Sequence, residues 1–188
     1  MTCRLAVMLI ASSLLIAASA VHAQSKPAAA PTKKPAAEKS QDKHEGRFGE
    51  WDAFTTTEGK AKVCYMLSRP KKSEGEVAKR QKAYMLVMHR PAANSTGVVS
   101  VNAGFDYKDG SEALVEIGAE KFQFYTSPKT PDTAWAIDDG KVLQAMFRAK
   151  SMVIRSTPAK GPAVADTYSL DGAQKAYQEM SKACGVKP

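Results

Sequence analysis

Apolar and polar residues alternate along much of the chain after residue 60, which is typical of strands that bury one face. The segment from Val99 to Phe105 is the clearest example. Turns that contain glycine or proline separate these segments, which cover residues 62–68, 83–89, 99–105, 113–117, 122–125, 152–157 and 164–168. The run from Ala83 to His89 is apolar at almost every position, which indicates a strand covered on both sides.

Two other segments have helical spacing. Residues 138–150 begin with two aspartates and then carry apolar residues three and four positions apart. The C-terminal segment ends at Cys184, and Ser169 or Asp171 is its expected cap; its apolar stripe is Ala173, Ala176, Tyr177 and Met180. The sequence therefore predicts a mainly β protein: an antiparallel β-sandwich or barrel of about seven or eight strands, with one or two helices that include a C-terminal helix.

The N-terminus has the pattern of a secretory signal peptide. Arg4 precedes an apolar run of about 16 residues, and Val21-His22-Ala23 places small residues where a signal peptidase cuts. We expect residues 1–23 to be removed; an uncleaved anchor helix is the alternative. Residues 24–47 are rich in lysine, alanine and proline, with no aromatic or large aliphatic residue before Arg47, so they predict a disordered linker. Residues 48–188 remain as one β domain.

The formal charge of +8 is spread over the chain, and the linker carries a modest basic excess. Outside the cytoplasm, such a tail is suited to anionic lipid or acidic glycan; a solvated spacer is the plainer interpretation. Export and the lack of a basic–aromatic groove pattern argue against nucleic acid as a partner.

The chain has three cysteines, and Cys3 leaves with the signal peptide. The remaining pair, Cys64 and Cys184, predicts one disulfide in an exported domain. Two free buried thiols are the alternative. Neither cysteine lies in a Cys-X-X-Cys motif, so no redox activity is predicted.

No catalytic, cofactor-binding or metal-binding residues are predicted. His89 stands alone at the end of an apolar run, while the other two histidines lie in the signal and the linker. The paired acids Asp138 and Asp139 fit a helix start. The aromatic residues are the ambiguous group, because they suit either the core or a ligand surface: Trp51, Trp135, Tyr107 and Tyr125.

Several short motifs occur in a definite order: Phe48-Gly49-Glu50-Trp51, Val63-Cys64-Tyr65, Gly104-Phe105 with Gly110-Ser111, Ala134-Trp135, and Asp166-Thr167-Tyr168-Ser169-Leu170 before the last helix. Their order and spacing resemble the invasion-associated locus B (IalB) family of alphaproteobacteria over about residues 48–188. The resemblance implies an exported β-rich domain of the periplasm or outer envelope and, for some pathogen members, a role in host-cell invasion. Many members carry a cysteine soon after the opening tryptophan. Residues 52–55 contain none here, which favours the Cys64–Cys184 pairing.

The pattern and the resemblance together favour an exported, non-enzymatic cell-envelope protein that is not integral to the membrane. Its expected partner is an envelope or host-surface protein, or an anionic lipid or glycan bound by the tail. The alternatives are a hydrolase that acts on an envelope polymer and a small-lipid carrier with an internal apolar cavity.

Overall fold

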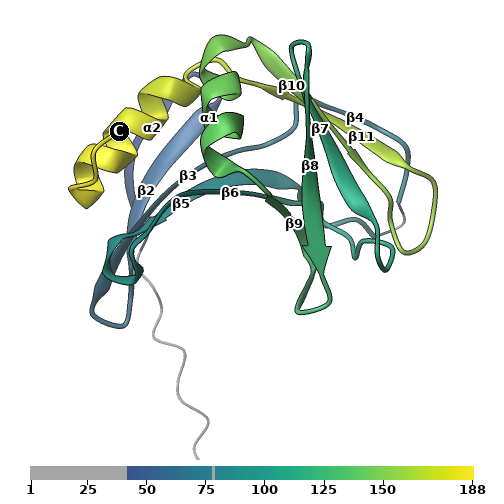
Figure 1. Cartoon of the computed structure of the whole chain (residues 1–188), viewed down its shortest axis with the longest axis horizontal. Coiled ribbons are helices and arrows are strands. Elements are labelled where there is room, and N and C mark those ends of the chain that lie inside the picture. Colours follow the sequence, from purple (N-terminus) through teal and green to yellow (C-terminus); the bar gives the residue numbers. More distant parts are fainter. Residues whose placement is uncertain (1–41, 78) are drawn as a thin grey trace, which may run out of the picture. The chain divides into compact units, whose positions relative to one another are not determined.

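The computed structural model describes residues 42–77 and 79–188, so the expected signal peptide and most of the expected linker lie outside the described residues. Within these ranges eleven strands form one antiparallel sheet, and two α-helices accompany it (Figure 1). The strands are β1 (Lys43–Phe48), β2 (Trp51–Glu58), β3 (Ala61–Ser68), β4 (Lys72–Glu74), β5 (Tyr84–Arg90), β6 (Ser95–Asn102), β7 (Glu112–Ile117), β8 (Glu120–Ser127), β9 (Thr130–Ala136), β10 (Ser151–Ser156) and β11 (Val164–Ser169). The helices are α1 (Asp139–Arg148) and α2 (Ala173–Cys184), and a short 3₁₀ turn, η1, spans Pro91–Ala93.

The predicted class is confirmed at the level of a mainly β, antiparallel fold with a C-terminal helix, but the strand number was too low. β1, β2, β4 and β9 were not predicted as strands. The domain also begins earlier than predicted, because Lys43–Phe48 forms β1 and pairs with β2. These segments are polar or short, so hydrophobic alternation alone does not reveal them.

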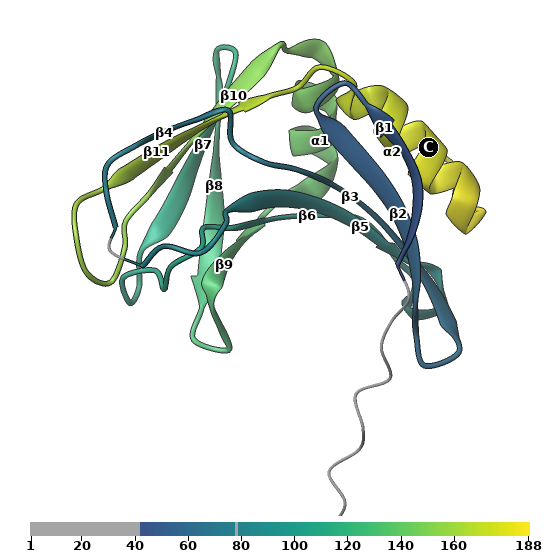
Figure 2. The same ribbon diagram turned by 180° about the vertical axis from the view of Figure 1, so that it is seen from behind.

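The strands follow the order β1-β2-β3-β5-β6-β9-β8-β7-β10-β11-β4 across the sheet. After β3 the chain crosses to the opposite edge, where β4 pairs with β11. The backbone N–H of Lys71 donates to Thr167 O at 2.8 Å, and that of Glu50 donates to Asp171 O at 3.1 Å. The Lys71 bond extends the pairing of β4 with β11 (Figure 2). The Glu50 bond joins the β1–β2 turn to the residues just after β11, so the sheet curls back on itself.

One face of the curled sheet holds the core, and the two helices lie on this inner face. In β5, for example, Met85, Val87 and His89 point inward and are buried. The largest fully buried side chains are Trp51, Tyr168 and Phe124. The Trp51 indole N–H donates to Ser169 O at 3.1 Å, so its one polar atom is paired where the sheet closes on itself.

Helix α1 begins as predicted at an acidic pair: the Asp138 carboxylate accepts a hydrogen bond from Lys141 N at 3.1 Å. Helix α2 begins differently, because its N-cap is Gly172 rather than Ser169 or Asp171. Gly172 has φ of +81°, and a Cβ there would lie 2.0 Å from the Phe48 carbonyl oxygen. The close approach of the β1–β2 turn thus requires glycine at this position.

Helix α2 packs its predicted stripe against β2 and β3, and its last residue is bonded to the sheet. Cys184 forms a disulfide with Cys64 of β3, as predicted, with their Cα atoms 5.9 Å apart. Beside this bond the buried His89 places Nε2 2.9 Å from Ser181 Oγ of α2, and its Nδ1 accepts from Gly97 N at 2.8 Å. The helix is therefore fixed by sulfur, by apolar contact and by hydrogen bonds.

Breaking the disulfide should destabilise the domain strongly. Cys64 and Cys184 are 120 residues apart, and closing a loop of that length stabilises the folded state by about 4–5 kcal/mol in the chain-entropy model. We expect the Cys64→Ser/Cys184→Ser double variant to lose free energy of unfolding of this order in urea titrations. Reductant should lower the stability of the parent protein and leave that of the double variant unchanged. Equal stability of the two proteins would contradict the role given to the bond.

The buried histidine should make stability depend on pH. Burial lowers the pKa of His89 below its ordinary value, so the unfolded chain takes up a proton before the folded one does as pH falls. The stabilisation is present above about pH 6.5 and decreases as the pH drops below that value. We expect His89→Gln, which keeps a donor for Ser181 and an acceptor for Gly97 N, to flatten the decline seen in urea titrations. Parallel pH profiles for the two proteins would count against this explanation.

Candidate binding face

The face of the sheet that points away from the helices carries a band of apolar side chains. In Figure 1 the helices lie above the arch of β5 and β6, and the opposite face of these strands lines its hollow side. Because side chains alternate between the two faces of a strand, the residues between the buried core positions point outward there. We call this band the outer apolar face and define it by Phe54, Tyr65, Leu67, Tyr84, Leu86, Met88, Val98, Tyr125 and Trp135.

Strand register arranges most of these side chains in two rows. In the first row Phe54 lies opposite Tyr65, Tyr65 opposite Met88, and Met88 opposite Val98. In the second row Leu67 lies opposite Leu86, and two strands further on Trp135 of β9 lies opposite Tyr125 of β8. Directly opposed side chains contact each other across strands, so the first row is continuous from β2 to β6. In the second row Ser100 of β6 lies between Leu86 and Trp135.

A small pocket lies between the two rows. It has a volume of about 150 Å³, and its apolar walls include Leu86, Met88, Val98 and Trp135. Ser100, Asn102 and Thr133 add polar groups to the lining. Sites for small molecules and cofactors usually enclose about 300–1,000 Å³, so this pocket suits one or two side chains of a larger molecule.

The β2–β3 end of the face is an aromatic stack. The rings of Phe54 and Tyr65 are nearly parallel, with centroids 5.0 Å apart, and the His44 ring packs on Phe54 at the same distance. Burial and the nearby Asp42 carboxylate raise the pKa of the Tyr65 hydroxyl above its ordinary value. The described chain thus begins, at Asp42, beside this aromatic stack.

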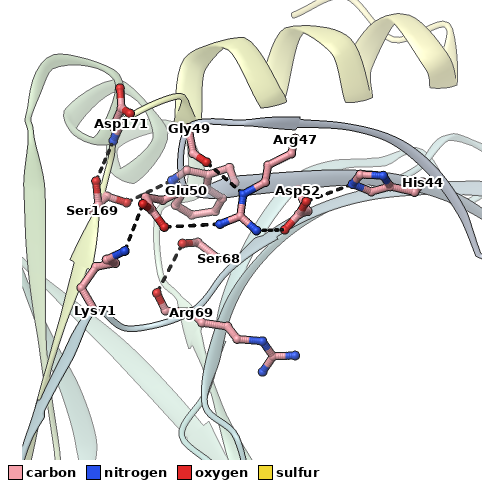
Figure 3. Close-up of polar contacts among 11 residues, drawn as sticks. His44, Arg47, Gly49, Glu50, Asp52, Ser68, Arg69, Lys71, Ser169 and Asp171 are labelled. Carbon is pink, nitrogen blue, oxygen red and sulfur yellow. Dashed lines mark hydrogen bonds and ion pairs between the residues drawn. The ribbon is translucent and has the colours of Figure 1, made fainter.

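A cluster of charged side chains adjoins the face, because Asp52 lies opposite Leu67 in the register (Figure 3). Arg47 lies 3.5 Å from both Glu50 and Asp52, and Lys71 Nζ lies 3.0 Å from Glu50 Oε1. His44 Nε2 lies 2.9 Å from Asp52 Oδ1 at the other side of the cluster. All of these side chains are partly exposed, so the pairs contribute little stability and form a polar rim.

The four aromatic residues singled out in the sequence divide into two pairs. Trp51 is 0% exposed and Tyr107 is 6% exposed, so both belong to the core and not to a ligand surface. Trp135 is half-buried on the outer apolar face, and its opposite neighbour Tyr125 is 48% exposed. The remaining members of the face were missed. Three of them, Tyr84, Leu86 and Met88, alternate with buried residues in the run from Ala83 to His89, which was predicted to be covered on both sides.

The carboxylates considered for catalysis have structural partners. Asp138 caps α1, and Asp139 Oδ1 accepts from Val99 N at 2.8 Å. In the ranges that the structure describes, no three His, Cys, Asp or Glu side chains are grouped as a metal site would require. His89 is occupied by its bonds to Ser181 and Gly97.

The most buried charge belongs to Asp166, which is 1% exposed on the inner face of β11. It forms a two-pronged ion pair with Arg80, and Ser73 Oγ donates to it at 2.6 Å. Arg80 Nε also donates to Ala103 O at 2.9 Å, and the Phe105 ring lies against the guanidinium. Because both oxygens of the Asp166 carboxylate accept hydrogen bonds from Arg80, this pair holds β4 and the segment before β5 in place and is assigned a structural role.

Comparison with known proteins agrees with this fold. Residues 51–181 match the family described as invasion associated locus B (IalB) protein, which is more than half of the chain. The chain belongs to this family. The matched region runs from the buried Trp51 to Ser181 of α2, so β1 and Cys184 lie outside it.

A solved structure of an IalB protein has a similar fold. The crystal structure of invasion associated protein b from Bartonella henselae superposes with a TM-score of 0.52, at 18% sequence identity, over 73% of this chain and 95% of the other. No curated protein matches the sequence. Neither helix of the described IalB domain has the length and apolar character needed to cross a membrane.

The aromatic stack gives a direct test of the outer face. Offset-stacked rings couple by about 0.5–1.5 kcal/mol beyond their burial, so Phe54→Ala and Tyr65→Ala should be non-additive by this amount in a double-mutant cycle. The measurement is the free energy of unfolding in urea. Phe54→Ala with Val153→Ala on the distant strand β10 is the control pair, and it should be additive within about 0.5 kcal/mol. Additivity in both pairs would mean that the two rings do not stack in solution.

Proposed function

We propose that this IalB protein is an exported, non-enzymatic component of the cell envelope that binds an extended segment of another protein on its outer apolar face. The observation that carries the proposal is the two-row apolar band on a sheet whose opposite face is already filled by its own core. Contiguous apolar surface of this kind in a folded domain is typical of a site for a partner.

The shape and chemistry of the face favour a polypeptide partner. The pocket between the rows is too small for most cofactors but has room for a protruding side chain, and aliphatic Leu86, Met88 and Val98 form much of its wall. Ser100, Asn102 and Thr133 supply hydrogen-bonding groups that an extended backbone uses. The charged cluster around Glu50 and Asp52 supplies a polar rim, as protein interfaces usually have.

Export is supported by the signal-like N-terminus and by the disulfide between Cys64 and Cys184. Disulfides persist in oxidising compartments such as the periplasm, where this bond stabilises α2. The structural partners of the acidic residues support a non-enzymatic role. Because the Bartonella henselae protein of similar fold is an invasion associated protein, the proposal includes a host-surface partner and a contribution to virulence beside a partner in the envelope.

The test is capture of partners by face variants of the mature protein, residues 24–188. Leu86→Ser and Trp135→Ala remove apolar contacts from the outer face, and Val153→Ser makes a matched change on β10. A photoreactive amino acid that replaces Tyr125, the most exposed member of the face, forms a crosslink to any molecule bound on the outer apolar face. The crosslinking is done in solubilised envelopes and in host-cell membranes. We expect Leu86→Ser and Trp135→Ala each to reduce the amount of crosslinked partner by about tenfold, which corresponds to a loss of about 1.4 kcal/mol of binding free energy. Val153→Ser should leave the amount of crosslinked partner unchanged.

Circular dichroism and thermal melting show whether each variant is folded. Crosslinks that map to one continuous segment of a captured protein support the proposal. Capture that is equal in all variants, or that yields only lipid or glycan, contradicts it.

A further inference from the structure

We propose that the segment bound on the outer apolar face carries an aspartate or a glutamate, and that its carboxylate pairs with Arg69 at the end of β3. The inference rests on the proposed function, because it names the chemistry of the partner at the same face. It is supported by the position of Arg69, by its lack of an acidic partner and by the hollow beside it.

Arg69 lies at the edge of the outer apolar face. In β3 the side chain of Leu67 belongs to that face, whereas Ser68 points to the core and lies opposite Met85 of β5. The alternation of a strand therefore places Arg69 on the same side as Leu67, one position beyond the end of β3. Its side chain is exposed there.

A row of polar groups continues from Arg69 along the border of the face. Tyr84 lies opposite Asn102, and Asn102 opposite Thr133; Asp132 at the far end accepts from the Asn102 amide at 2.7 Å. Burial raises the pKa of the Tyr84 hydroxyl, Asp132 adds to this shift, and the nearby Arg69 guanidinium opposes it. The row thus has a positive charge at one end and a negative charge at the other. A partner's carboxylate is attracted to the Arg69 end and repelled from the Asp132 end.

The Arg69 guanidinium has no acidic partner in the described part of the chain. The carboxylates of Glu50 and Asp52 are already paired, because Lys71 Nζ lies 3.0 Å from Glu50 and Arg47 lies 3.5 Å from both. Figure 3 shows the Arg69 side chain directed away from these two carboxylates. The five other arginines in residues 42–77 and 79–188 each pair with a carboxylate: Arg47, Arg80, Arg90, Arg148 and Arg155.

A hollow of about 300 Å³ lies beside Arg69. Leu67 and Pro70 contribute apolar groups to its wall. Three basic and two acidic side chains also line it, so one positive charge is in excess: Arg47, Arg69, Lys71, Glu50 and Asp52. Because Leu67 belongs to the outer apolar face as well, a segment bound on that face can place one acidic side chain in the hollow.

The backbone on both sides of Arg69 is fixed before a partner binds. Ser68 is 1% exposed, and Pro70 restricts the residue before it to extended conformations. The next residue, Lys71, donates its N–H to Thr167 O of β11 at 2.8 Å. Binding therefore orders only the side chain of Arg69, and its planar guanidinium suits a two-pronged pair with a carboxylate.

The pairing is tested with the mature protein, residues 24–188, and a phage library of random linear peptides. Selected sequences are made as synthetic peptides, and their affinities are measured by fluorescence anisotropy. We expect them to carry an aspartate or a glutamate beside apolar residues. Arg69→Gln should weaken their binding about tenfold, as the loss of a charged hydrogen-bonded pair does. The control is Arg155→Gln on β10, which removes a guanidinium already paired with Glu116 and should leave the affinity unchanged.

A double-mutant cycle identifies the pair. Exchanging the acidic residue of the peptide for its amide should weaken binding to the parent protein about tenfold, but binding to Arg69→Gln by no more than about twofold. A new selection on Arg69→Glu should enrich lysine or arginine at the same place in the peptides. Thermal melting shows that each variant is folded.

Two results overturn the inference: selected peptides without an acidic residue, or an amide peptide that loses as much affinity for Arg69→Gln as for the parent. Displacement of the peptide by a long-chain fatty acid whose binding requires Arg69 would assign the arginine to a lipid carboxylate and also overturn it. If Leu86→Ser weakens peptide binding and Arg69→Gln does not, the inference fails and the proposed function stands. If Leu86→Ser leaves every selected peptide bound, the proposed function fails and the inference fails with it.

Discussion

The fold depends on the attachment of α2 to one face of a curled sheet. The disulfide from Cys184 to Cys64, the buried contacts of Met180 and the hydrogen bond between His89 and Ser181 all act on the same side of β3 and β5. Because the helices cover only this inner face, nothing in the described part of the chain covers the other face of these strands. One-sided packing therefore leaves the apolar residues on that outer face half-buried, and the proposed function depends on them.

This division places the core and the proposed binding face on opposite sides of the same strands. Side chains such as Met85 and Val87 lie in the close-packed core, where a change of volume destabilises the protein. Their neighbours Leu86 and Met88 are only half-buried, so substitutions there affect stability less. The disulfide-stabilised sheet keeps the two outer rows in register, which would limit the entropy lost in the proposed binding of a partner.

Much of the fold could be predicted from the sequence, because its signals are local. Alternation in 99–105, the stripe on α2 and the pair of exported cysteines all indicated the observed structure. The threonine-rich β2 and the three-residue β4 were missed because they owe their pairing to distant strands. The outer apolar face was missed for a different reason. A run that is apolar on both sides indicates a strand with both faces covered. In β5 only the face that carries Met85, Val87 and His89 is covered. Sequence cannot show which of two apolar faces remains without a partner.

Oxidation of methionine by hydrogen peroxide tests this one-sided packing most directly, because susceptibility follows exposure. Met88 lies on the outer face, whereas Met66, Met85, Met146, Met152 and Met180 are buried. In the protein of residues 24–188, mass spectrometry should show Met88 oxidised about tenfold faster than the buried five. Equal rates for Met88 and the buried methionines would mean that the outer face is covered, and would contradict the account.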